Sequence, residues 1–141
     1  MDRLKVMYSS KTDLWATPQY FFDKLDKEFG FTLDPCATKD NAKCNKFYTI
    51  EQDGLKQKWE GEIVFCNPPY GKVIGDWVRK CSEEAKKPST TVVALLPART
   101  DTRWFHDYIY HKAKDIRFIK GRLKFGDSKN SAPFPSMIVV F

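Results

Sequence analysis

The sequence has no long uninterrupted run of apolar residues. No stretch of its 141 residues approaches the roughly 20 apolar residues that a membrane-spanning helix needs. The N-terminus, from Met1 to Lys5, also lacks the apolar core of a secretory signal peptide. We therefore expect a cytoplasmic protein with no membrane partner.

Metal-binding patterns are absent from the sequence as well. The cysteines are widely spaced, no two of them form a C-x-x-C pair, and both histidines come late in the chain. Structural zinc sites take their ligands from closely spaced pairs, so we predict no metal site and expect reduced, structural thiols. The cysteines are Cys36, Cys44, Cys66 and Cys81, and the histidines are His106 and His111.

Internal repeats, low-complexity tracts and Pro/Ser-rich linkers are missing too. A length of 141 residues fits one domain and leaves no room for a second domain of ordinary size. We predict a single domain over residues 1–141, with residues 1–12 as a flexible N-terminal stretch. The sequence leaves the oligomeric state open between monomer and dimer.

The sequence is rich in positive charge and in aromatic side chains. Its 24 Lys and Arg residues outnumber 18 Asp and Glu residues, which gives a net charge of +6, and 15% of the residues are aromatic. A basic surface concentrates polyanions around a protein, and exposed aromatic rings stack on nucleic-acid bases. Both features favour a nucleic-acid partner, although many basic proteins have none.

Segments of helical and strand character alternate along the chain. Apolar side chains on one helical face predict a helix that begins after Thr17, as N-cap, and stops at Gly30. Continuous apolar runs at 63–66 and 91–96 predict strands buried on both faces. The alternation indicates an α/β sheet that is mainly parallel. Further strands are expected at 31–36, 47–50, 115–124 and 135–141, and further helices at 74–87 and 101–111.

The segment Asn-Pro-Pro-Tyr at residues 67–70, here called the NPPY segment, directly follows a buried strand. Asp34 also stands at a predicted strand end, and ligands of parallel sheets bind beyond such ends. The Asn67 side-chain oxygen and the Pro68 carbonyl can accept both N–H groups of an exocyclic amine, and this directs its lone pair at a methyl donor. The prolines keep these acceptors rigid, and Tyr70 offers a flat face to a flipped base. The pattern therefore predicts methyl transfer to an amino nitrogen, with adenine N6 in DNA as the favoured acceptor.

Several other blocks accompany the NPPY segment in a fixed order: 15–18, 33–37, 41–42, 65–71, 96–102 and 121–125. Together they make residues 13–141 resemble the small phage-type DNA N6-adenine methyltransferases. The resemblance implies a compact, Rossmann-like S-adenosylmethionine-dependent methyltransferase fold with a mostly parallel central sheet. It also implies a phage or prophage gene that is expressed in a bacterial host.

The resemblance further implies S-adenosyl-L-methionine as cofactor and double-stranded DNA as substrate. Asp34 would hold the methionine ammonium of the cofactor, and Asp53 would accept from its adenine amino group. The predicted catalytic residues are Asn67, Pro68, Pro69 and Tyr70; the predicted cofactor-binding residues are Trp15, Thr17, Asp34, Pro35, Cys36, Asp53 and Asn67; the predicted DNA-binding residues are Lys43, Arg99, Arg103 and Lys129.

Some alternatives stay open. No glycine-rich loop follows the first predicted strand, and Asp40 and Glu51 are both candidates for a ribose-binding acid. Asp53 with Gly54 also fits an ordinary turn. The acceptor of an NPPY-type enzyme can instead be an adenine in RNA or a glutamine in protein, and a catalytically inactive nucleic-acid-binding relative is a third interpretation.

Overall fold

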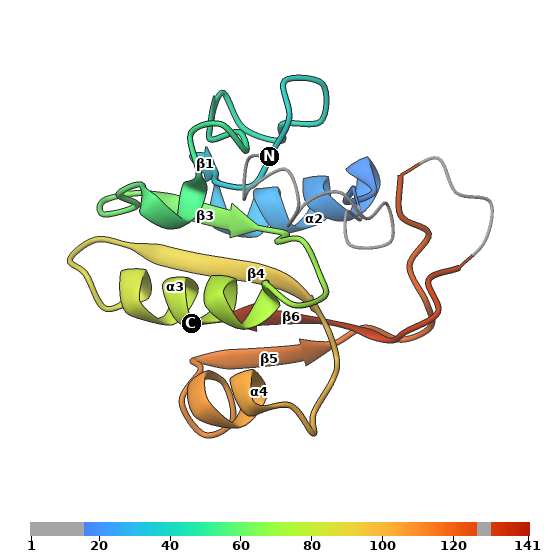
Figure 1. Ribbon diagram of the computed structural model, residues 1–141. Coiled ribbons are helices and arrows are strands. Elements are labelled where there is room, and N and C mark those ends of the chain that lie inside the picture. The colour runs from blue at the N-terminus through green and yellow to red at the C-terminus, as the bar shows by residue number, and fades with distance from the viewer. Residues whose placement is uncertain (1–15, 127–130) are drawn as a thin grey trace.

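The computed structural model describes residues 16–126 and 131–141, shown in Figure 1. The predicted flexible stretch at 1–12, Trp15 and Lys129 lie outside these residues. The strands described are β1 (Leu33–Asp34), β2 (Lys46–Phe47), β3 (Ile63–Cys66), β4 (Thr91–Pro97), β5 (Asp115–Phe118) and β6 (Ser136–Val140). The helices described are α2 (Gln19–Phe29), the short 3-10 helix η2 (Gly54–Lys56), α3 (Ile74–Ala85) and α4 (Arg103–Tyr108).

The strands form a mixed six-stranded sheet in the order β2-β1-β3-β4-β6-β5. Strands β2, β1, β3 and β4 pair in parallel, and β6 runs antiparallel to both of its neighbours, β4 and β5. The carboxyl ends of β1 and β3 therefore meet at the same edge of the sheet. Because β3 is continued by the NPPY segment, the topology brings that segment beside Asp34.

The two central strands confirm the predictions from their apolar runs. β3 begins and ends as predicted, and β4 extends the predicted 91–96 by one residue, Pro97. Five successive residues of β4, 92–96, are fully buried. A strand that buries side chains on both of its faces must be covered on both faces, and helix α3 packs against β4 on one of them.

Helices α2 and α3 cover opposite faces of the sheet next to the site. Successive residues of a strand point to opposite faces. Phe65 packs edge-on against Phe22 of α2, with ring centroids 5.1 Å apart. The next residue, Cys66, lies on the other face beside Cys81 of α3, where burial and then the Cys81 thiol raise the pKa of the Cys66 thiol. No helix within 16–126 and 131–141 is long and apolar enough to cross a membrane.

The predicted role of Thr17 as N-cap of α2 was wrong. The helix begins at Gln19, and Pro18 occupies the cap position with φ −58° and ψ 134°, without a side-chain cap hydrogen bond. The Pro18 carbonyl accepts from the N–H groups of Phe21 and Phe22. The Thr17 side chain instead accepts a hydrogen bond from the side chain of Asn67. The predicted stop is confirmed, because Gly30 adopts a left-handed conformation with φ 69°.

Several predicted elements are shorter than their apolar patterns. The strand expected at 31–36 is reduced to β1, because Pro35 has no N–H to continue the ladder. The strand expected at 47–50 shares only Phe47 with β2. Helix α4 begins at Arg103 rather than Asp101, since Thr102 caps it by accepting from the Phe105 N–H at 3.3 Å.

Candidate active site

A cavity lies beyond the carboxyl ends of β1 and β3, where the sequence predicted one shared site. It has about 760 Å³ of free space, part of it open to solvent. This size is typical of small-molecule sites. Of the predicted site residues, Thr17, Asp34, Pro35, Cys36, Lys43, Asn67, Pro68 and Pro69 line it.

Asp34 provides a buried carboxylate in this cavity and is only 5% exposed. The backbone N–H of Lys43 donates to its Oδ2 at 3.0 Å, and that of Cys36 donates to its Oδ1 at 3.3 Å. Burial raises the pKa of Asp34 to about 6, against the lowering effect of the two backbone hydrogen bonds. Asp34 is therefore fixed in place, and its negative charge lacks full solvation.

Asn67 is held from both ends of its side-chain amide. Its Nδ2 donates to Thr17 Oγ1 at 2.9 Å, and its Oδ1 accepts from the Tyr70 hydroxyl at 3.2 Å. The same hydroxyl lies 3.3 Å from the Leu95 carbonyl oxygen on β4. Segments separated widely in sequence therefore fix the position of this one amide.

Tyr70 is buried rather than open to the cavity, with 2% exposure. Its ring packs nearly perpendicular to Phe125 and Phe134, with centroids 6.5 Å and 5.4 Å away. Burial raises the pKa of the Tyr70 hydroxyl, so that it stays a neutral donor. A base reaches the ring face only if neighbouring side chains move.

Asp53 forms the turn before η2 and does not line the cavity. Its backbone has a positive φ of 55°, and its side chain accepts from the Leu55 N–H at 3.1 Å. The next residue, Gly54, does line the cavity. A Cβ atom on Gly54 would lie 2.1 Å from the Pro35 carbonyl oxygen, so this close approach requires glycine.

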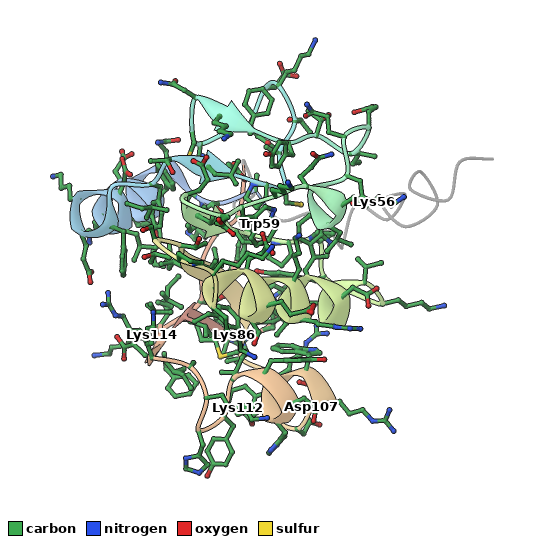
Figure 2. The ribbon with its side chains drawn as sticks, turned by 90° about the vertical axis from the view of Figure 1, so that its left-hand side faces the viewer. Lys56, Trp59, Lys86, Asp107, Lys112 and Lys114 are labelled. Carbon is green, nitrogen blue, oxygen red and sulfur yellow. The ribbon has the colours of Figure 1, made fainter. Side chains whose placement is uncertain are left out.

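Two tryptophans support the η2 side of the cavity. Trp59, labelled in Figure 2, is fully buried, and its indole N–H donates to the Gly54 carbonyl at 3.0 Å. Its ring stacks on that of Trp77, with centroids 6.4 Å apart. Trp77 lines the cavity, and its indole N–H is a buried donor with no hydrogen-bond partner within the described ranges.

Sequence reasoning missed the contributions of Gly54, Trp77 and Ile50 to the cavity wall. Trp77 was expected only as a core residue of its helix, and its 1% exposure fits that expectation equally well. Helical spacing indicates which side chains face inward but not what they meet there. An adjoining hollow shares several lining residues with the cavity and is also lined by Glu51.

The predicted DNA-binding cations that the structure describes lie either after the end of β4 or in the cavity wall. Arg99 and Arg103 are exposed and follow the end of β4. The Arg99 guanidinium lies 5.9 Å from the ring centre of Phe134, which contacts Tyr70. Lys43 lines the cavity beside Asp34, and its Nζ donates to Gln19 Oε1 at 2.8 Å.

The chain is similar to known DNA methyltransferases over most of its length. The family model described as DNA N-6-adenine-methyltransferase (Dam) matches residues 5–141. A DNA N-6-adenine-methyltransferase of Haemophilus phage HP1 (strain HP1c1) is 35% identical over 140 residues, which cover 94% of this chain and 80% of that protein. A DNA N-6-adenine-methyltransferase of Escherichia phage T1 is 36% identical over 106 residues, which cover 74% of this chain and 44% of that protein.

Proposed function

This chain belongs to the DNA N-6-adenine-methyltransferase (Dam) family and is an adenine-specific DNA methyltransferase, and on that premise we propose how its cavity performs the reaction. The cavity binds S-adenosyl-L-methionine, and Asn67 presents the N6 amino group of a flipped adenine from double-stranded DNA. The observation that carries this proposal is the meeting of Asp34 and Asn67 at neighbouring strand ends in one cavity.

We propose that the fold is a Rossmann-like variant. The crossover from β3 through α3 to the parallel neighbour β4 supports this, as does the position of the cavity beyond the strand ends. Arg99 and Arg103 would then hold DNA phosphates near the flipped base.

The described residues fit S-adenosyl-L-methionine in three respects. Asp34 offers a fixed and poorly solvated carboxylate to the methionine ammonium. Gly54 contributes bare backbone to the cavity wall, because its missing side chain lets it lie against the Pro35 carbonyl, and Trp77 has a buried indole N–H without a partner among the described residues. When bound, the cofactor supplies an electrophilic methyl group. Trp15 and Thr17 stay predicted contacts to it, and Asp53 stays a predicted acceptor for its adenine amino group.

Asn67 and Pro68 prepare the target amine. In this proposal Asn67 Oδ1 and the Pro68 carbonyl accept the two N6–H groups, which draws the nitrogen out of conjugation with the ring. The lone pair would then be directed at the methyl group that the cofactor supplies: an N–C bond would form as the S–C bond breaks, and the nitrogen would lose one proton to water. The two prolines of the NPPY segment are buried, so the acceptors are in place before the base arrives.

The substrate class is tested by offering DNA, RNA and protein to the enzyme in parallel, each with methyl-labelled S-adenosyl-L-methionine. We expect label in the DNA, and after digestion only in N6-methyladenine. Label in RNA or protein with unmodified DNA would contradict the proposed substrate. Calorimetry with the cofactor alone tests the binding part separately, because it requires no nucleic acid.

A further inference from the structure

We propose that Thr17 is a positioning residue for methyl transfer, a role that rests on the proposed function of Asn67. Its hydroxyl oxygen accepts from Asn67 Nδ2 at 2.9 Å. This bond holds the Asn67 amide in the rotamer that presents its oxygen to the target amine. Thr17 acts through Asn67 and does not itself need to touch the base.

The Thr17 hydroxyl is committed to this contact. A threonine just before a helix usually caps it, but α2 has no side-chain cap hydrogen bond, and Pro18 occupies the cap position. Thr17 is 5% exposed, so the hydrogen bond to Asn67 is shielded from competing water. The contact joins residues 50 positions apart in sequence, so it depends on the tertiary structure and not on the local backbone conformation.

The backbone around Thr17 is anchored on both sides. The carbonyl of Ala16 accepts from the Gly126 N–H at 2.8 Å. On the other side, the proline ring restricts the φ of Pro18, whose carbonyl begins the hydrogen bonds of α2. Thr17 therefore provides a fixed point from which a side-chain hydroxyl can orient another residue.

Packing between α2 and β3 sets the distance from Thr17 to Asn67. Phe22 of α2 comes five residues after Thr17, and Phe65 precedes Asn67 by two residues. The two rings meet edge-on at 5.1 Å, and both are buried. The same packing that docks the helix on the sheet therefore brings the threonine hydroxyl to the amide.

The hydrogen bond from Tyr70 completes the arrangement at the other end of the amide. An asparagine side chain has two rotatable bonds, and methyl transfer depends on where its oxygen points. Tyr70 holds the oxygen end at 3.2 Å, and Thr17 holds the nitrogen end at 2.9 Å. Since Thr17 also lines the cavity, it connects the cofactor side of the site with the residue that binds the base.

Replacement of Thr17 by valine and by serine tests this role. Thr17→Val keeps the shape and removes the hydroxyl, whereas Thr17→Ser keeps the hydroxyl. With both substrates saturating, we expect kcat of Thr17→Val to fall about tenfold or more, because a misplaced acceptor acts on the transition state. The KM for DNA should change much less, and Thr17→Ser should recover most of the lost kcat.

A matched control separates positioning from removal of a buried hydroxyl in general. Thr90 is 6% exposed, its hydroxyl accepts from the Gly61 N–H at 2.8 Å, and it lies outside the cavity wall. Thr90→Val should lower the melting temperature and leave kcat within about twofold of wild type.

Two results would overturn the role of Thr17. One is a Thr17→Val enzyme with kcat within about twofold of wild type, and the other is a Thr17→Ser enzyme as slow as Thr17→Val. Asn67→Ala, assayed alongside, distinguishes this failure from a failure of the proposed function. If Asn67→Ala is inactive and Thr17→Val is not, only the positioning role is wrong.

Discussion

The Pro35 carbonyl oxygen occupies the space in which a side chain at Gly54 would begin. A Cβ atom at Gly54 would lie 2.1 Å from that oxygen and 3.0 Å from the Trp77 ring. Pro35 ends the β1 side of the cavity and Gly54 begins η2, so this contact sets how closely two walls of the site approach.

We therefore expect Gly54→Ala to push these walls apart. The added Cβ atom would meet the Pro35 carbonyl oxygen, which belongs to the backbone and cannot rotate away as a flexible side chain could. The free energy of unfolding should fall by about 1–3 kcal/mol, and cofactor affinity should fall as well. Urea unfolding and calorimetry measure the two effects. Gly75→Ala in α3 is the matched control, since its Cβ meets nothing nearer than 3.9 Å. Gly75→Ala should leave the free energy of unfolding unchanged or raise it by up to about 1 kcal/mol. Equal decreases in unfolding free energy for Gly54→Ala and Gly75→Ala would contradict the proposed effect of the contact between Gly54 and Pro35.

Cofactor affinity should depend on pH through Asp34. The pKa of this carboxyl is raised from 3.8 to about 6 by burial, so it becomes protonated below about pH 6. Protonation removes the charge that would attract the methionine ammonium, and the Kd should rise about tenfold between about pH 8 and about pH 5. Calorimetry across this range measures it. Asp34→Asn should bind weakly at every pH, and a wild-type Kd that does not change with pH would contradict the role of Asp34.

The same pKa has the opposite effect on the stability of the free protein. A carboxyl whose folded-state pKa is raised stabilises the fold most fully below its unfolded pKa of 3.8, and this contribution is lost as pH rises through about 6. A shift of this size corresponds to about 3 kcal/mol. In urea unfolding of the free enzyme, the stability of wild type relative to Asp34→Asn should therefore decline between about pH 4 and about pH 7. A difference that is constant across this range would contradict the burial argument.

Tyr70→Phe should lower kcat while the protein still folds. The variant keeps the ring that packs on Phe125 and Phe134 and lacks the hydroxyl that donates to Asn67. We expect a decrease of about 1 kcal/mol in unfolding free energy and a several-fold decrease in kcat at saturating substrates. Unfolding and steady-state assays are the measurements. Tyr70→Ala should lower the unfolding free energy by about 3–5 kcal/mol, because it removes the ring together with the hydroxyl and leaves a cavity.

Arg99→Ala and Arg103→Ala should weaken DNA binding in a salt-dependent way. Removing one phosphate-binding cation lowers the slope of log K against log salt by about one. Lys86, labelled in Figure 2, is an exposed cation directly after the carboxyl end of α3, and Lys86→Ala should leave the slope unchanged. Titration of a fluorescent duplex at several salt concentrations measures the slopes, and equal slopes for all three variants would exclude these arginines as phosphate-binding residues.

The sequence predicted those features that follow from local patterns. The apolar runs located β3 and β4 almost to the residue, and the strand ends identified Asp34 and Asn67 as neighbours. The contact between Thr17 and Asn67 was beyond prediction, because it depends on how α2 docks on the sheet. Local capping rules indicated a different partner for Thr17.

The wall formed by Gly54 and Trp77 was missed for a related reason. A glycine after an aspartate fits an ordinary turn, and a tryptophan on an apolar helix face fits the core. Only the tertiary structure shows that both residues border the space that Asp34 and the NPPY segment enclose.

The most direct test of the account compares wild type with Asn67→Ala on unmethylated duplex DNA, with nucleosides identified by mass spectrometry and cofactor binding followed by calorimetry. We predict N6-methyladenine from wild type, none from Asn67→Ala, and cofactor affinity and melting temperature nearly equal in the two proteins. An Asn67→Ala enzyme that methylates adenine at close to the wild-type rate would contradict the central claim that Asn67 presents the target amine.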